Sequence, residues 1–373
     1  MNVPFFDYSR VYASERVVVE PKIQEILNRS DFILRDDVVN FEKEIANYSE
    51  SKFMVGVANG TDAIWLSLNA LGIGDGDEVI LPSHTYVATA DAVRFVGATP
   101  VLVDCDADHL VSLDAIKEAI GEKTTAIIPV NLNGRACKLD EIVELASRKK
   151  LAVIEDNAQG LGARFKGKPT GTFGHAGTLS FFPAKNLGCY GDGGGVLTQD
   201  FEIVESLRKL RNHGRDENGN VVDWGFNSRL DNLQAGILSA KLKTLDDSIE
   251  RRRALAKIYN HRLHNLEEVK LPAAPDTDFD YFDSFQNYEI EAEQRDALVS
   301  FLKEKGIGTS LPWAGKAVHH FGLKGCLEKD LSNTNNLFKK ILLLPMNQYL
   351  TDSEVEYVCD AIIDFYKKSR NYH

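Results

Sequence analysis

Lys185 is the residue whose position best suits it for chemistry. It lies in the run Ser180-Phe-Phe-Pro-Ala-Lys-Asn-Leu-Gly188, which follows an apolar segment of strand length and precedes the glycine-rich stretch 188–195. Such a loop keeps the lysine stem partly buried, and burial lowers a lysine pKa and favours the neutral, nucleophilic amine. A lone lysine here is more often an ordinary turn residue, so other segments must distinguish the two interpretations.

A second segment, residues 57–62, has the composition of an anion site. The run Val57-Ala-Asn-Gly-Thr-Asp62 predicts a strand end that turns into a helix beginning near Thr61. Gly60 permits close backbone approach, the free N–H groups and dipole of the helix favour an anion, and the Thr61 hydroxyl adds a donor. Ser180, just before the lysine loop, is a further candidate donor to a phosphate. The alternative is an ordinary Asn-Gly turn in which Thr61 is the helix N-cap.

A third segment, residues 151–160, is an apolar strand that ends in the carboxylate of Asp156. A carboxylate at the rim of a sheet is costly unless it meets a cation or a strong donor, and a protonated pyridine nitrogen is one such partner. A helix cap is the alternative. The glycines that follow lack the G-x-G-x-x-G spacing, so we reject a dinucleotide-binding fold. A phosphate cradle, a pyridinium partner and an amine nucleophile together fit pyridoxal 5′-phosphate (PLP) better than any alternative.

The composition is that of a globular protein large enough for two cores. The chain has 373 residues, of which 43% are hydrophobic and 26% charged. It contains no apolar stretch long enough to span a bilayer, and residues 1–10 lack the features of a secretory signal, so we expect a cytoplasmic protein without membrane association.

Charge and cysteines exclude other classes of function. The net charge of −12 argues against nucleic acid as a partner, because phosphate binding needs a concentrated basic face. The five cysteines are scattered and form no Cys-x-x-Cys pair, so neither a disulfide framework nor a metal site is indicated.

The elements that must position these residues follow an α/β pattern. Apolar runs of strand length alternate with segments of helical period from Ser51 onward, which is typical of a mostly parallel sheet flanked by helices. We predict seven strands, at 53–57, 78–81, 99–104, 124–130, 151–155, 177–182 and 194–198, with helices at 61–71, 86–96, 113–120 and 139–149.

The pattern changes in the C-terminal third of the chain. One long amphipathic helix is expected from Leu230 toward Leu263, and beyond Pro272 strand and helix patterns alternate at 285–292, 295–305, 342–345 and 352–366. We therefore predict a large domain with an N-terminal segment (residues 1–250) and a linking helix with a smaller α+β domain (residues 251–373).

Several motifs, in order, resemble those of the DegT/DnrJ/EryC1/StrS sugar aminotransferases, which have the aspartate-aminotransferase type of fold. The resemblance spans nearly the whole chain. Its carriers are the runs 59–63 (Asn-Gly-Thr-Asp-Ala), 81–89 (Leu-Pro-Ser-His-Thr-Tyr-Val-Ala-Thr), 155–159 (Glu-Asp-Asn-Ala-Gln), 180–188, 211–214 (Arg-Asn-His-Gly) and 225–236 (Gly-Phe-Asn-Ser-Arg-Leu-Asp-Asn-Leu-Gln-Ala-Gly).

The resemblance implies a role for each matching residue. Lys185 would be the Schiff-base lysine, Asp156 the partner of the pyridine nitrogen, and Gln159 a contact to the ring hydroxyl. The phosphate would be held by Gly60, Thr61 and Ser180, and Tyr86 would stack on the ring, although a lone tyrosine there is more often a core residue. Asn227 would reach the phosphate in the neighbouring subunit, which implies a homodimer with shared active sites.

The chain departs from the family pattern near the substrate. Gly160-Leu161 stands where many relatives carry a histidine, and Asn131-Leu-Asn-Gly134 replaces a His-Leu-Tyr-Gly stretch. The region of Trp313–His320 would face the nucleotide sugar, where Lys316, His319 and His320 could contact a diphosphate.

The resemblance implies a transaminase that moves an amino group from L-glutamate to a keto group of a nucleotide-linked deoxy sugar, for surface polysaccharides such as the O-antigen of lipopolysaccharide. The N-terminal run Val3-Pro-Phe-Phe-Asp7 is closer to members that aminate C3 than to those that aminate C4. Lys185 argues against a related dehydratase branch that carries histidine in its place. A noncatalytic regulator that binds PLP or a pathway intermediate is the alternative from another class.

Overall fold

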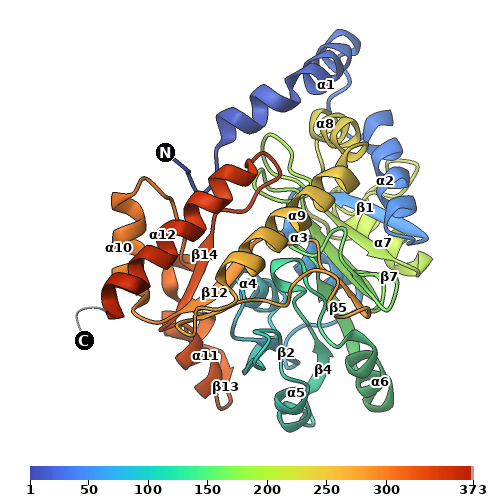
Figure 1. Cartoon of the computed structure of the whole chain (residues 1–373). Helices are drawn as coiled ribbons and strands as arrows, with labels where there is room; N and C mark the ends of the chain where they lie inside the picture. Colours follow the sequence, from blue (N-terminus) through green and yellow to red (C-terminus); the bar gives the residue numbers. More distant parts are fainter. Residues whose placement is uncertain (371–373) are drawn as a thin grey trace.

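The centre of the molecule is an eight-stranded sheet, seen in a computed structural model that describes residues 1–370 (Figure 1). Within this sheet β9 alone runs antiparallel to its neighbours, so the predicted mostly parallel sheet is confirmed. In spatial order the strands are β1 (Phe53–Val57), β9 (Gly194–Thr198), β8 (Ala176–Ser180), β5 (Ala152–Asp156), β4 (Thr124–Ile127), β2 (Glu78–Pro82), β3 (Thr99–Val103) and β13 (Leu327–Glu328).

The eighth strand, β13, is the departure from the seven strands that we predicted. It comes from the C-terminal part of the chain and pairs in parallel with β3 at the edge of the sheet. Two residues carry no periodicity from which a strand could be predicted.

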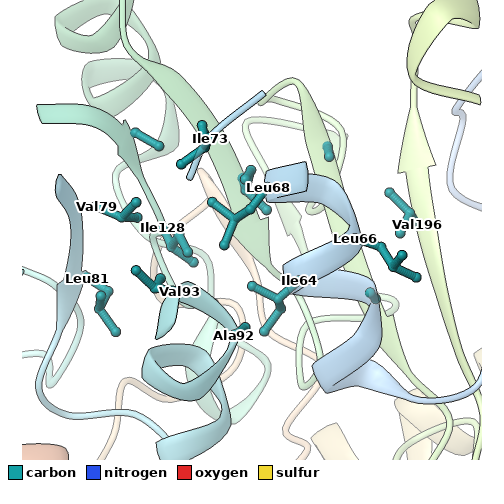
Figure 2. Packing of buried hydrophobic residues seen from close by; sticks show 14 of the residues in the cluster. Ile64, Leu66, Leu68, Ile73, Val79, Leu81, Ala92, Val93, Ile128 and Val196 are labelled. Carbon is teal, nitrogen blue, oxygen red and sulfur yellow. The ribbon is translucent and has the colours of Figure 1, made fainter. Parts of the chain in front are cut away.

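Helices cover both faces of the sheet. Side chains alternate along each strand, so Val79 and Leu81 point to one face and Ile80 to the other. Figure 2 shows the first face, where Val79 and Leu81 lie in one apolar cluster with Ile64 and Leu68. The helices on this face are α3 (Gly60–Ala70), α4 (Val87–Phe95) and α7 (Phe201–Leu210); those on the other are α2 (Asp36–Tyr48), α5 (Leu113–Ala119), α6 (Leu139–Lys149) and α8 (Asn232–Leu242).

Strand register brings three distant segments together at the same end of neighbouring strands. Gly194 of β9 pairs with Val57 of β1 on one side and with Ser180 of β8 on the other. Asp156, the last residue of β5, pairs with Thr178 of β8. The start of α3, the lysine loop after β8 and the carboxylate of β5 therefore meet at the carboxyl ends of β1, β8 and β5. Open α/β sheets bind their ligands at this end of the strands.

The C-terminal part forms a second core around an antiparallel sheet of order β10 (Val269–Lys270), β12 (Tyr288–Ala292) and β14 (Ile341–Leu344). It packs against α9 (Leu245–Leu263), α10 (Arg295–Glu304) and α12 (Asp352–Arg370), which Figure 1 shows beside the large sheet. Val3 also lies in this core and bridges to Ile307, although we counted it with the first domain. The boundary between residues 250 and 251 falls inside α9 and stays a prediction.

The prediction of one helix from Leu230 to Leu263 was wrong. The chain forms α8 and α9 with a break at Lys243-Thr244, where Thr244 leaves the helical backbone region (φ −118°, ψ 15°). Buried apolar residues recur at helical spacing on both sides of the break, so the periodicity does not reveal it.

Further elements complete the chain. A small sheet of order β11 (Tyr281–Phe282), β6 (Arg164–Phe165) and β7 (Lys168–Pro169) ties the segment before β12 to the large domain. The remaining helices are α1 (Tyr8–Arg29), α11 (Ser332–Leu337) and the short 3-10 turns η1 (Leu132–Gly134), η2 (Pro312–Gly315) and η3 (Val318–Phe321). Among residues 1–370, no helix combines the length and apolar character needed to cross a membrane.

Candidate active site

Lys185 lies in the loop between β8 and β9, as the sequence predicts. Its backbone N–H donates to the carbonyl of Phe182 at 2.8 Å, which forms the turn that carries the amine. Part of the side chain is exposed, yet burial of the amine lowers its pKa to about 8, while the nearby Asp156 carboxylate opposes this shift. A substantial fraction of this amine is therefore neutral near physiological pH.

Asp156 is a buried carboxylate with few donors. Its Oδ2 accepts a hydrogen bond from Thr89 Oγ1 at 2.8 Å, and its Oδ1 accepts from the backbone N–H of Ala158 at 3.2 Å. Burial raises the pKa of Asp156, whereas Thr89, Ala158 and the charge of Lys185 lower it. A cation bound beside it would relieve the desolvation of this carboxylate, which fits a protonated pyridine nitrogen.

The first turn of α3 has free hydrogen-bond donors where the sequence predicts an anion cradle. Asn59 is the N-cap, and its side chain accepts from the N–H of Asp62 at 2.8 Å. The helix begins at Gly60, and within residues 1–370 the N–H groups of Gly60 and Thr61 and the Thr61 hydroxyl have no protein partner. Thr61 is thus not the N-cap, and its hydroxyl stays available to a ligand.

Ser180 lies directly against this turn. A Cβ placed on Gly60 would come within 2.9 Å of Ser180 Cβ and 3.3 Å of its hydroxyl oxygen. Only glycine allows this close approach, which gathers the Ser180 hydroxyl and the free N–H groups of α3 in one place. These donors fit a phosphate group.

Tyr86 and Gln159 each stand in a segment that is connected to Asp156. Tyr86 is the N-cap residue of α4 and is 55% exposed; it follows Thr85, whose hydroxyl bonds that of Thr89 at 2.9 Å. Gln159 follows Asp156 by three residues, and its Oε1 is occupied by protein donors, whereas its amide nitrogen has no acceptor among residues 1–370. That nitrogen is available to donate to a ring hydroxyl.

Asn227 is exposed beside the anion cradle of its own chain. The neighbouring Ser228 donates to Asp62 Oδ2 at 2.6 Å and accepts from the N–H of Ala58 at 3.3 Å, so this segment adjoins the first turn of α3. The contact of Asn227 with a neighbouring subunit stays a prediction.

The structure places Lys316, His319 and His320 around η3, and here the imidazoles already have protein partners. His319 contacts Ser83 Oγ at 2.6 Å and Asn335 Oδ1 at 3.0 Å, while His320 contacts the N–H of Ala317 at 3.1 Å and Asn335 Oδ1 at 2.9 Å. Lys316 is exposed and has no carboxylate partner among residues 1–370. A role for these three residues in substrate binding stays a prediction.

Two kinds of residue that hydrogen-bond the candidate site escaped the sequence reasoning. Thr89 lies inside a motif that we quoted, but only the fold shows that it donates to Asp156. Gln286 and Asn287 contact the lysine loop and Gln159 from about 100 residues away along the chain, and no local pattern marks them.

Together these residues fit PLP. The free donors of the first turn of α3 and Ser180 would suit its phosphate, Asp156 would pair with its ring nitrogen, and the Lys185 amine would bind its aldehyde carbon.

Comparison with known proteins agrees with this geometry. Residues 15–363 match the model of the DegT/DnrJ/EryC1/StrS aminotransferase family. A "pleiotropic regulatory protein" of Geobacillus stearothermophilus is 40% identical over 98% of this chain and 99% of its own. The dTDP-3-amino-3,4,6-trideoxy-α-D-glucose transaminase of Streptomyces venezuelae is 39% identical over 97% and 95%. The crystal structure of S. venezuelae DesV in complex with a ketimine intermediate has a TM-score of 0.93, at 38% identity and 98% coverage of both chains. Family match, identity and fold agree: the chain belongs to the DegT/DnrJ/EryC1/StrS aminotransferase family.

Proposed function

We propose that this PLP-dependent aminotransferase moves an amino group from L-glutamate to the C3 keto group of a nucleotide-linked deoxy sugar. The observation that carries the proposal is the juxtaposition of a buried lysine amine, a buried carboxylate and a phosphate cradle at one edge of the sheet. The name of the S. venezuelae relative, which specifies a 3-amino sugar, supports the choice of C3.

Each site residue has a defined task in this reaction. PLP, when bound, supplies the electron sink that stabilises the carbon from which a proton is removed. The backbone N–H groups at the start of α3 and the hydroxyls of Thr61 and Ser180 hold the phosphate, and the Asp156 carboxylate keeps the ring nitrogen protonated. The neutral Lys185 Nζ would take the proton from the donor Cα and pass it to the cofactor carbon that carries the amino group. In the second half-reaction the same amine would take that proton back and deliver it to the sugar carbon that gains the amine.

We also propose that the active enzyme is a homodimer, with Asn227 of each subunit reaching the other subunit's phosphate site. Support comes from large apolar side chains that are exposed within a few residues of Tyr86, Lys185 and Asn227 or, for Phe32 and Ile33, in the segment that bonds Asp231 and Asn232. They are Phe32, Ile33, Tyr86, Phe182, Trp224 and Phe226, of which Trp224 is 91% exposed.

The cellular setting that we propose is the cytoplasm, where the product would enter amino-sugar and surface-polysaccharide biosynthesis, including the O-antigen of lipopolysaccharide. Soluble nucleotide-linked sugars are cytoplasmic precursors in such a route. The acidic net charge of −12 also fits a small-molecule substrate better than a nucleic acid.

A substrate panel tests the proposal. Purified protein with PLP and L-glutamate is incubated with 3-keto and with 4-keto nucleotide sugars, and amination is followed by mass spectrometry. Amination of the 3-keto compounds supports the proposal. Amination of the 4-keto compounds alone would establish the alternative, a 4-keto nucleotide-sugar aminotransferase.

The name of the G. stearothermophilus relative favours a second candidate, a noncatalytic regulator that binds PLP or a pathway intermediate. The same panel distinguishes it, because a regulator would bind PLP without aminating any keto sugar. Lys185, with its lowered pKa, favours the enzyme.

A further inference from the structure

The side chain of Gln286 joins the two peptide groups that adjoin Lys185. Its Nε2 donates to the carbonyl oxygen of Ala184 at 2.8 Å, and its Oε1 accepts from the N–H of Asn186 at 2.7 Å. A carbonyl only accepts and a backbone N–H only donates, so the two contacts define the orientation of the amide. Gln286 is buried, and water cannot easily replace either bond.

The next residue, Asn287, makes a corresponding contact with Gln159. Its Nδ2 donates to Gln159 Oε1 at 3.2 Å and to Asn133 Oδ1 at 2.9 Å, while the backbone N–H of Asn133 donates to the same Gln159 oxygen at 2.8 Å. With its oxygen held by two donors, Gln159 has its amide nitrogen directed away from them. Asn133 lies in the stretch where this chain departs from the family pattern.

The segment that carries both side chains is itself firmly held. Arg252 of α9 is buried, and its NH1 donates to the carbonyls of Phe285, Gln286 and Met346, each at 3.2 Å. Ser284 Oγ accepts from the side chain of Asn186 at 3.1 Å, which adds another bond to the lysine loop.

The opposite side of the segment is closed by η1. Gly134 has a φ of 86°, and a Cβ there would lie 2.5 Å from Ser284 Oγ, so the large domain approaches the segment as closely as glycine allows. The backbone of residues 284–287 is therefore fixed from both domains.

We propose that Gln286 and Asn287, from the C-terminal part of the chain, are positioning residues of the active site: Gln286 orients Lys185, and Asn287 orients Gln159. This inference rests on the proposed function. Proton transfer depends on sub-ångström placement of the base, and partner side chains supply such placement. Docking of the C-terminal part against the large domain is then a condition for the geometry of the site.

The decisive variant is Gln286→Glu, which preserves size. Its carboxylate still accepts from Asn186 but presents a lone pair to the Ala184 carbonyl, so the bond on that side is lost. We expect kcat to fall about fivefold, the equivalent of one neutral hydrogen bond, with a smaller change in the KM for L-glutamate. Protonation of the introduced carboxylate would let it donate to Ala184 again, so the deficit relative to the wild type should shrink as the pH falls.

A second variant, Asn287→Asp, tests the other half independently of whether the first one folds. Asparagine and aspartate have the same shape, and Asn287 lines a cavity of about 350 Å³. The change therefore needs no repacking of neighbouring side chains. Loss of its donors should shift the pH midpoint of the visible absorption band of lysine-bound PLP. The matched control is Asn333→Ala, which removes a 2.9 Å hydrogen bond from the side-chain amide of Asn333 to the carbonyl of Cys105. This bond also joins the C-terminal part to the large domain, but it does not involve the lysine loop.

The outcomes are separable. A pH-relieved deficit in Gln286→Glu and a shifted midpoint in Asn287→Asp, with Asn333→Ala like the wild type, support the inference. Variants that titrate and turn over like the wild type, or that lose activity only as much as Asn333→Ala does, overturn it and leave the proposed function intact. A wild-type protein without the visible band would overturn the proposed function as well.

Discussion

Thr89 Oγ1 donates a 2.8 Å hydrogen bond to Oδ2 of Asp156. Among residues 1–370, Thr89 is the one residue whose side chain donates a hydrogen bond to this buried carboxylate. The bond works against desolvation, because it stabilises the ionised form that a protonated pyridine nitrogen needs as its partner. Thr89 thereby links α4 to the end of β5 and helps to set the charge of the site.

Replacing Thr89 by valine should weaken PLP binding about tenfold, because a hydrogen bond to a charged group is lost and the pKa of Asp156 rises further. The Kd is measured by absorbance titration of the apoprotein. Thr89→Ser keeps the hydroxyl and should bind PLP nearly as the wild type does; equal weakening by both substitutions would show that the methyl group, and not the hydrogen bond, is what matters.

Gly60→Ala should raise the Kd for PLP about tenfold, because the new Cβ would lie 2.9 Å from Ser180 Cβ and push the first turn of α3 away from β8. Gly121→Ala is the matched control, since the nearest atom to its added Cβ is 3.9 Å away. An unchanged Kd in Gly60→Ala would contradict the placement of the phosphate.

The pH dependence of covalent PLP binding follows from Lys185. Burial lowers the pKa of its amine to about 8, and only the neutral amine attacks, so the attachment rate should rise with pH and level off above about 8. Stopped-flow absorbance on the apoprotein measures this rate. A rate that still climbs toward the ordinary lysine pKa of 10.5 would show that the amine is not buried in solution.

The distance along the chain explains which parts of the site could be predicted from the sequence. Lys185, Asp156 and Thr61 each stand beside a strand or a helix start, so local pattern and chemistry identify them. The contact of Gln286 with Ala184 spans 102 residues and that of Thr89 with Asp156 spans 67, and both exist only because the chain folds. The alternative in which Thr61 is the N-cap was wrong, since Asn59 caps α3, and the sequence cannot separate the two because both are good capping residues.

Helices and strands were likewise predictable where a local pattern in the sequence marks them. β1, β9 and α6 have the predicted bounds, because their apolar periods end at clear turn signals. The break between α8 and α9 and the two-residue strands leave no such signal, and β13 forms only because the C-terminal part meets β3.

Trp224→Asp should convert the proposed homodimer to monomer at micromolar concentration and lower activity, because an aromatic side chain at the centre of an interface often contributes about 2 kcal/mol or more. Light scattering coupled to gel filtration measures the mass. Phe279→Asp is the control, since Phe279 is similarly exposed, at 97%, but lies in the loop before β11. A wild-type protein that is monomeric and fully active would contradict the shared site.

The most direct test is the absorption spectrum of the PLP-loaded protein before and after addition of L-glutamate. The wild type should show a visible band from lysine-bound PLP, and glutamate should convert it to the shorter-wavelength pyridoxamine form; Lys185→Ala should lack the original band. A Lys185→Ala protein with an unchanged visible band, or a wild-type band that glutamate leaves untouched, would contradict the assignment of Lys185 as the lysine that binds PLP and transfers the proton.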